Sequence, residues 1–194
     1  MKVAVVKYNA GNVESVRNAL RRLNVEPVLT DDAETLKSCD KVIFPGVGEA
    51  STAMKYLRDR NLDKVIKSLK QPVLGVCLGM QLLCEFSEEN ETGCLGILPY
   101  KVSKFVSDKL KVPQMGWNNI FNLKSVLFKG IAENSFVYFV HSFYVESGAE
   151  TIAACDYGVN FSAAAQHKNF YAVQFHAEKS GVVGARILEN FLKL

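Results

Sequence analysis

The sequence lacks the features that would place the protein in a membrane or in a secretory pathway. It has no apolar run long enough to span a bilayer, and the N-terminal apolar stretch of residues 3–6 is too short for a signal peptide. It also has no internal repeat, low-complexity tract or linker. We therefore expect one cytoplasmic domain that comprises residues 1–194 and does not bind membranes.

Paired cysteines and clustered basic residues are missing as well. The five cysteines are odd in number and include no CxxC pair, which argues against a disulfide framework and against a zinc site. The net charge is +3, but the lysines and arginines are scattered and lack the interleaved aromatic residues of single-strand binders. We expect no metal, no cofactor and no nucleic-acid partner.

Strand and helix patterns alternate through the first half of the chain. Short β-branched or apolar runs predict strands at residues 3–7, 26–29, 41–44 and 72–76. Apolar residues three and four apart mark a first helix at Val13, Val16, Leu20 and Leu23, and further helix at residues 50–69 with a break at Asn61. This alternation predicts an α/β fold, flavodoxin-like, with a mixed, mostly parallel sheet and helices on both faces.

The second half of the chain is rich in strands and turns. A helix over residues 78–86 is followed by predicted strands at residues 102–106, 137–140, 143–146, 151–155, 162–166 and 171–175. These strands indicate an antiparallel or mixed region, and an amphipathic helix over residues 182–194 ends the chain.

The segment GVCLGMQ, residues 75–81, has the pattern of a nucleophile elbow. It follows an apolar strand and places Cys77 between Gly75 and Gly79. A side chain at the tip of a sharp strand-to-helix turn needs such neighbours without a Cβ. A helix that begins at Leu78 would direct free backbone N–H groups at the thiol and favour the thiolate.

A cysteine nucleophile needs a base, and the chain has three histidines. His176 stands at the end of an apolar strand, and Glu178 lies two residues later, on the same face if the strand is regular. A carboxylate there would fix the imidazole tautomer and favour the imidazolium. We expect His167 to be exposed and His141 to have a structural role.

An oxyanion intermediate requires at least two N–H donors. The residue after the nucleophile, Leu78, supplies one, and we expect the second from Val47 in the loop PGVG, residues 45–48. This loop lacks the Lys-Ser/Thr of a P-loop, so we do not expect it to bind nucleotides.

The motifs PGVG, GVCLGMQ and QFHAEKSG, in this order, resemble those of the class I glutamine amidotransferases. The resemblance implies a glutaminase with Cys77 as nucleophile, His176 as general base and then acid, and Glu178 as the residue that orients it. Two more segments, PQMGWN at residues 113–118 and VYFVHSFY at residues 137–144, resemble the glutaminase subunits of imidazole glycerol phosphate synthase.

The same resemblance implies how the substrate, glutamine, is held: by the side chain of Gln81 and by groups matching Gly46, Gly48, Ser142 and Phe143. It places Glu89 at the substrate amine, although the sequence Glu88-Glu89-Asn90-Glu91 alone equally indicates a solvated acidic loop. It also implies a heterodimer with a (β/α)8-barrel cyclase of histidine biosynthesis. Residues that would face this partner are Asn12, Trp117, Tyr138 and Lys179.

One position departs from the family pattern. The usual proline between the histidine and the glutamate is Ala177 here, which removes a restraint on the backbone between base and carboxylate. Three alternatives stay open: a paralogous glutaminase that feeds another amidating synthetase, a non-catalytic docking subunit, and a cysteine peptidase or hydrolase.

Overall fold

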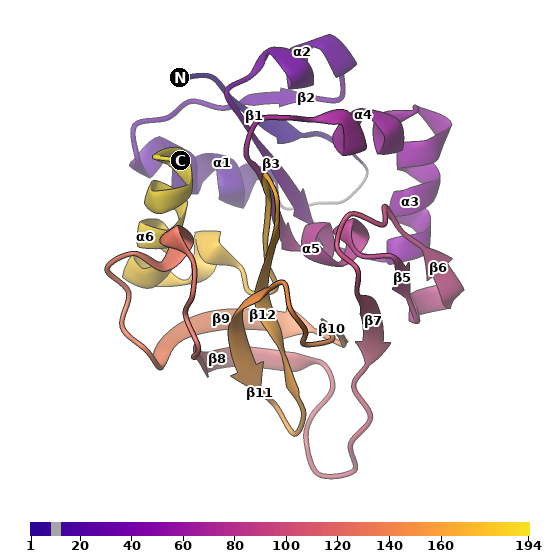
Figure 1. Ribbon diagram of the computed structural model, residues 1–194, viewed down its shortest axis with the longest axis vertical. Helices are drawn as coiled ribbons and strands as arrows, with labels where there is room; N and C mark the ends of the chain where they lie inside the picture. The colour runs from indigo at the N-terminus through magenta and orange to yellow at the C-terminus, as the bar shows by residue number, and fades with distance from the viewer. Residues whose placement is uncertain (9–12) are drawn as a thin grey trace.

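The first half of the chain supplies four parallel strands of a central sheet (Figure 1). The computed structural model describes residues 1–8 and 13–194. The predicted strands form within a few residues of their expected bounds: β1 (Val3–Val6), β2 (Val28–Thr30), β3 (Lys41–Gly46) and β4 (Val73–Cys77). Their spatial order is β4-β3-β1-β2, and all neighbours among them are parallel.

Three strands from the second half extend this sheet beyond β4. They are β13 (Phe170–Val173), β12 (Asn160–His167) and β11 (Thr151–Asp156), and they complete the seven-stranded order β11-β12-β13-β4-β3-β1-β2. β12 is antiparallel to both of its neighbours, whereas β13 runs parallel to β4. The mostly parallel, mixed sheet predicted from the sequence is therefore correct.

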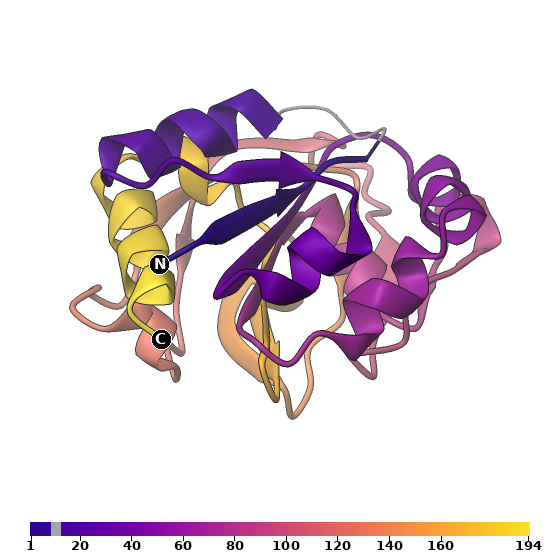
Figure 2. The same cartoon turned by 90° about the horizontal axis from the view of Figure 1, so that it is seen from above.

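Helices cover both faces of the sheet, as predicted. Figure 2 shows α1 (Val13–Arg22) and α6 (Gly181–Leu192) together on one side, away from α3 (Ala50–Asp59) and α4 (Leu62–Ser68). Residues of β1 alternate between the faces: Val3 and Val5 join the core under α1 and α6, whereas Ala4 and Val6 join the core under α3 and α4.

Two helices differ from the prediction. The six-residue helix α2 (Ala33–Ser38) was not predicted, because its one buried residue, Leu36, gives no periodic signal. The elbow helix α5 (Leu78–Leu83) is shorter than expected, because the chain turns at Cys84 and enters the short strand β5 (Phe86–Ser87). The predicted break at Asn61 is correct: this residue adopts a left-handed conformation, with φ of 56°, between α3 and α4.

Two smaller sheets complete the fold. One has the order β10-β7-β5-β6, with β6 (Thr92–Gly93), β7 (Lys101–Lys104) and β10 (Phe143–Val145). The other pairs β8 (Gln114–Ile120) with β9 (Ser135–His141). We did not predict β8, whose sequence QMGWNNI is rich in residues that strands disfavour; its pairing with β9 stabilises it.

Short 3-10 turns link these elements: η1 (Glu89–Glu91), η2 (Val126–Phe128) and η3 (Ala177–Lys179). Within the described residues, no helix has the length and apolar character needed to cross a membrane.

Candidate active site

Strand register brings three loops to the same edge of the sheet. Gly46, the last residue of β3, is paired with Cys77, the last residue of β4, and Val173 of β13 is paired with Val76. Because these strands are parallel, the segments that follow them all leave at their carboxyl ends, where ligands bind in α/β sheets. The PGVG loop, the elbow and His176 are therefore neighbours.

Cys77 lies at a sharp turn between β4 and α5. It has φ of 54° and ψ of −111°, and the helix begins at the next residue, as predicted. A residue with a Cβ at positive φ is strained by ~1–3 kcal/mol, and the surrounding structure must hold it there. The strain presents the thiol at the helix start, where the backbone N–H of Leu78 has no partner within the helix.

The glycines of the elbow allow close packing of α5 on the sheet. A Cβ on Gly79 would lie 1.9 Å from the carbonyl oxygen of Phe44 in β3, and one on Gly75 would lie 2.8 Å from Leu83 Cδ1. Neither glycine has a positive φ. The prediction that the motif needs glycines is thus confirmed. At Gly79 the cause is the close approach of the α5 backbone to the β3 backbone.

His176 and Glu178 contact each other at the start of η3. The distance from His176 Nδ1 to Glu178 Oε1 is 2.8 Å, and both side chains are almost fully buried. Burial disfavours the imidazolium, but hydrogen bonding and charge from Cys77 and Glu178 outweigh it and raise the pKa of His176 to about 10. The site therefore favours a protonated His176 beside the sulfur of Cys77.

The route to this contact differs from the predicted one. The two residues do not lie on a regular strand; β13 ends at Val173, and His176 precedes a 3-10 turn. The turn is tied to β9, because His176 N–H donates to the Tyr138 carbonyl at 2.9 Å. Ser180 Oγ adds a second tie: it donates to the His176 carbonyl at 2.7 Å and accepts from Tyr138 N–H at 2.9 Å. These bonds hold the base in place with Ala177 in the position of the usual proline.

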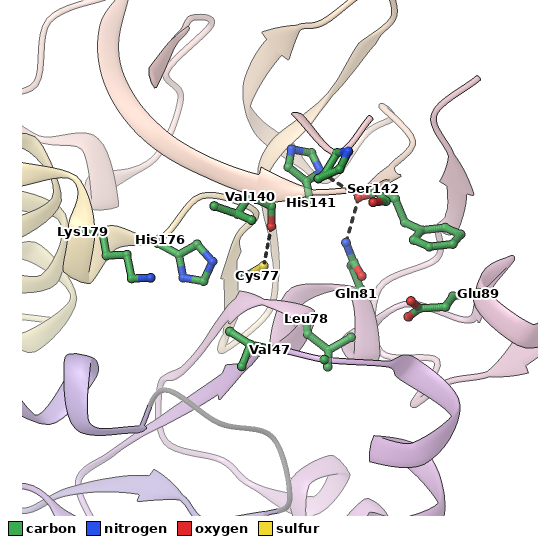
Figure 3. Close-up of a pocket in the computed structure, with 13 residues that line it drawn as sticks. Val47, Cys77, Leu78, Gln81, Glu89, Val140, His141, Ser142, His176 and Lys179 are labelled. Atoms are coloured by element: carbon green, nitrogen blue, oxygen red, sulfur yellow. Dashed lines mark hydrogen bonds between the residues drawn. The ribbon is translucent and has the colours of Figure 1, made fainter. Parts of the chain in front are cut away.

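A cavity of about 340 Å³ opens over Cys77 and contains most of the predicted site residues (Figure 3). In Figure 3, Lys179 and Glu89 lie at opposite ends, with Cys77 between them. The lining residues are Val47, Gly48, Cys77, Leu78, Gln81, Glu89, Pro113, Val140, His141, Ser142, Phe143, His176 and Lys179.

Some predicted residues lie outside the cavity wall. Glu178 lies behind His176, and the predicted substrate residue Gly46 is buried beneath the loop, where a Cβ would meet the Tyr8 hydroxyl at 2.5 Å. Trp117 and Tyr138 lie on β8 and β9, with ring centroids 5.9 Å apart. The prediction for Asn12 falls outside the described residues.

Glu89 differs from the acidic residues next to it. Glu88 and Glu91 are exposed, and Glu88 pairs with Lys101. Glu89 is half-buried at the cavity wall, where Oε2 accepts from the Ala50 N–H at 2.7 Å. Burial raises its pKa despite this bond. The interpretation of Glu89 as a solvated loop residue is therefore wrong.

The other two histidines have structural contacts. The His141 ring nitrogens lie 2.7 Å from the Phe143 carbonyl oxygen and 2.9 Å from Gln114 Oε1, and burial lowers the pKa of His141 to about 4. His167 is not exposed as expected: it is half-buried, with Nδ1 3.1 Å from Glu150 Oε1. Neither arrangement leaves a free base for Cys77.

Two site residues were missed by the sequence reasoning. Tyr8 is buried, and its hydroxyl donates to the Pro45 carbonyl at 2.6 Å, which fixes the start of the PGVG loop. Gln174 is fully buried and contacts both Gln81 and Cys77. A polar residue in an apolar strand two positions before His176 was the available signal for Gln174; nothing in the sequence pointed to Tyr8.

Chemically, the arrangement combines a thiol, a buried imidazole–carboxylate pair and backbone N–H groups around a polar cavity. This combination suits acyl transfer through a thioester. Among the described residues, no group of three or more His, Cys, Asp or Glu could hold a metal ion.

Comparisons with a family profile and with individual proteins agree on one family. A profile described as glutamine amidotransferase class-I matches residues 4–194. A Bacteroides fragilis protein named imidazole glycerol phosphate synthase subunit HisH is 59% identical over 196 residues, covering 100% of both chains. A protein of the same name from Haemophilus influenzae is 45% identical, covering 100% of this chain and 98% of its own.

Solved structures agree on the fold. A putative GMP synthase protein from Thermoplasma acidophilum has a TM-score of 0.76 at 21% identity, covering 100% of this chain and 93% of that one. PurLQS from Thermotoga maritima has a TM-score of 0.70 at 16% identity, covering 99% and 97%. At such identities the likeness concerns the fold alone.

Proposed function

The chain belongs to the class I glutamine amidotransferases, and from this premise we propose that residues 1–194 form one glutaminase domain that hydrolyses glutamine to glutamate and ammonia. It acts as the glutaminase subunit of an imidazole glycerol phosphate synthase in histidine biosynthesis, in line with full-length identities of 45–59% to proteins of that name. The observation that carries the proposal is Cys77 at a strained elbow beside the buried His176–Glu178 pair.

Cys77 and His176 carry out the bond changes in this proposal. The thiolate attacks the side-chain amide carbon of glutamine, and the imidazolium of His176 gives its proton to the departing ammonia, which leaves a glutamyl thioester. His176 then removes a proton from water, the hydroxide attacks the thioester, and glutamate leaves as the thiolate is restored. Glu178 holds Nδ1 at 2.8 Å throughout, so the other ring nitrogen faces the reaction.

Two backbone N–H groups stabilise the negative oxygen of both tetrahedral intermediates. One belongs to Leu78, at the first position of α5, and the other to Val47, in the PGVG loop next to Leu78 (Figure 3). Each such donor contributes ~10²-fold or more to the rate, because it is in place before charge develops.

The two charged groups on the substrate Cα need partners of opposite charge. The Glu89 carboxylate, at the far end of the cavity from Lys179, binds the α-ammonium. Backbone N–H groups at Gly48, Ser142 and Phe143 bind the α-carboxylate, and Gln81 contacts the side chain of the substrate. Gly46 contributes indirectly, since it allows the loop to lie against Tyr8.

A partner enzyme must receive the ammonia. Free ammonia is mostly protonated at neutral pH and would diffuse away, so the product is useful only if it passes directly to an acceptor. We propose that the acceptor is a (β/α)8-barrel cyclase that forms a heterodimer with this chain. The ammonia is passed on before it equilibrates with solvent.

The outer face of the β8–β9 ribbon is the surface that such a partner would cover. The face carries the exposed residues Met115 (65%), Trp117 (55%) and Phe136 (58%), together with Tyr138, which is paired with Trp117. Val140 on the same face lines the cavity, so the apolar surface reaches the site where ammonia forms. Lys179 at the rim and Asn12 complete the proposed contact.

Glutamate release from glutamine tests this function. We expect slow hydrolysis by the wild type alone, strong stimulation by the histidine-pathway cyclase, and no release by Cys77→Ala in either case; Cys94→Ala, a half-buried thiol outside the site, is the matched control. Absence of glutamate release in every mixture would refute the proposed glutaminase activity. Activity that the cyclase never raises would favour the paralogous glutaminase.

The interface can be tested in the same assay. Trp117→Ala should weaken stimulation by the cyclase, whereas Val126→Ala, with a similar exposed fraction of 59% but outside the β8–β9 ribbon, should not. Equal stimulation of the two variants would place the partner elsewhere.

A further inference from the structure

A buried amide side chain connects the catalytic cysteine with the glutamine that lines the cavity. Gln174 follows β13, its backbone N–H donates to the Ala163 carbonyl at 2.8 Å, and its side chain is fully buried. It is absent from the cavity wall. Gln174 can therefore act on the reaction only through its neighbours.

The direction of the hydrogen bonds is set by a backbone carbonyl. Gln81 Nε2 lies 2.9 Å from the Phe143 carbonyl oxygen and 3.0 Å from Gln174 Oε1. The reverse orientation of Gln81 would set its oxygen against the Phe143 oxygen, and a carbonyl cannot donate. Both N–H groups of Gln81 are thus used, and its oxygen Oε1 is the group left for the cavity.

The same reasoning determines the orientation of the Gln174 side-chain amide. Its oxygen accepts from Gln81, so its amide nitrogen must point the other way, where Nε2 lies 3.7 Å from Cys77 Sγ. The sulfur also interacts with the His176 imidazole and with Tyr8, and as a thiol it can donate to the Val140 carbonyl oxygen at 3.8 Å. That oxygen can accept from a thiol but repels a thiolate, whereas the Gln174 N–H favours the thiolate.

We propose that Gln174 is a positioning residue for glutamine hydrolysis, with two tasks. It donates an N–H to Cys77 and so increases the thiolate population, and it holds Gln81 with the side-chain oxygen toward the cavity. An oxygen there accepts from a substrate N–H and disfavours a carboxylate, which helps the site bind glutamine in preference to the product glutamate. The inference takes one thing from the proposed function, namely that the substrate is glutamine.

Two variants separate the tasks. Gln174→Met, similar in size and apolar, removes both contacts. Gln174→Glu keeps an acceptor for Gln81 but places a carboxylate oxygen beside the sulfur. Gln71→Met is the matched control, because Gln71 makes a comparable side-chain bond to the Leu36 carbonyl at 2.7 Å far from the cavity. Thermal unfolding verifies that each variant is folded.

The first readout is the rate of Cys77 alkylation by iodoacetamide against pH, followed by mass spectrometry of the peptide that contains Cys77. It needs neither glutamine nor a partner. In both Gln174 variants we expect about 10-fold slower alkylation at neutral pH, because the sulfur loses a hydrogen-bond donor. Gln71→Met should follow the wild type.

The second readout is the KM for glutamine in the complex with the cyclase. Gln174→Met should raise KM about 5-fold or more, because Gln81 then keeps only its bond to the Phe143 carbonyl, whereas Gln174→Glu should leave KM within about twofold and lower kcat.

Unchanged alkylation in folded Gln174→Met and Gln174→Glu would overturn the first task, and unchanged KM in Gln174→Met would overturn the second. If the complex had no glutaminase activity at all, the proposed function would fail while the alkylation result still judged the contact with Cys77.

Discussion

The two walls of the cavity are built in different ways. The nucleophile wall (Val47, Gly48, Cys77, Leu78 and Gln81) comes from two strand-to-helix turns, each contained in a few consecutive residues. The base wall (Val140, His141, Ser142, Phe143, His176 and Lys179) comes from the junction of β9 with β10 and from the segment at η3, which are more than 30 residues apart (176 − 143 = 33). Each turn of the nucleophile wall is shaped by its own local backbone, whereas the position of His176 depends on bonds between the η3 segment and β9.

This difference predicts where substitutions act. Changes at the elbow behind the nucleophile wall should disturb folding, since Gly79 packs against the backbone of β3. Changes in the base wall should alter proton transfer first, since its polar bonds hold the imidazole.

The largest effect is expected for the carboxylate behind the base. Glu178→Gln keeps the shape but removes the charge that favours the imidazolium and the correct tautomer, so kcat should fall by about 10²–10⁴-fold. Steady-state glutaminase kinetics with the cyclase measure it. The His167–Glu150 pair supplies a matched control: at 3.1 Å it has similar geometry outside the cavity, and Glu150→Gln should keep kcat within about twofold. Equal losses in the two variants would contradict the special role of Glu178.

Gly79→Ala tests the nucleophile wall. The new Cβ would meet the Phe44 carbonyl at 1.9 Å, so α5 must move away from β3. We expect a loss of about 2–3 kcal/mol in the free energy of unfolding. Chemical denaturation measures the loss. Gly93→Ala, whose Cβ would lie 3.6 Å from the flexible Arg58 side chain, is the control. A Gly79→Ala protein as stable as the wild type would show that the contact between α5 and β3 can accommodate a Cβ.

The pH dependence tests the base wall. The pKa of His176 in the folded protein, about 10, exceeds the unfolded value of about 6.5. Its stabilising contribution is therefore fully present below pH 6.5 and is lost as pH rises through 10. The alkaline limb of kcat/KM should lie near pH 10, and an NMR titration of His176 should give the same midpoint. A midpoint near 6.5 would show that neither Cys77 nor Glu178 raises the pKa of His176.

The smallest effect is expected from the tie between η3 and β9. Ser180→Ala removes a hydroxyl that bonds the His176 carbonyl and the Tyr138 N–H, so about 1–2 kcal/mol of stability and about 10-fold in kcat should be lost. Kinetics and thermal unfolding measure both. Ser135→Ala, which removes a bond to the Ala132 carbonyl at the far end of β9, should change only stability. An unchanged kcat in Ser180→Ala would show that Ala177 needs no support from β9.

The predictable part of the molecule follows from patterns within short segments. Alternating strands and helices indicated the parallel sheet, and GVCLGMQ indicated the elbow with its helix start at Leu78. The helix α2 and the strand β8 escaped prediction because one has a single buried residue and the other a polar sequence. Their stability depends on neighbours that the local sequence does not contain.

Within the site, the contact of His176 with Glu178 was expected from spacing on a strand, yet it forms on a 3-10 turn. The two residues are only two positions apart in the chain, so either backbone path brings their side chains together. Glu89 could not be distinguished from Glu88 and Glu91 in sequence, because its direction depends on the N–H of Ala50, 39 residues away.

The sequence by itself determined which residues can do chemistry: a cysteine framed by glycines, a histidine near a carboxylate, and the motifs of an amidotransferase. The reason is that sharp turns and short spacings restrict the backbone locally. Only the tertiary structure decided which polar groups lose water and meet. Pairing of β13 with β4 placed His176 beside Cys77 and buried Gln174 against both Cys77 and Gln81, because parallel register aligns strand ends from distant parts of the chain.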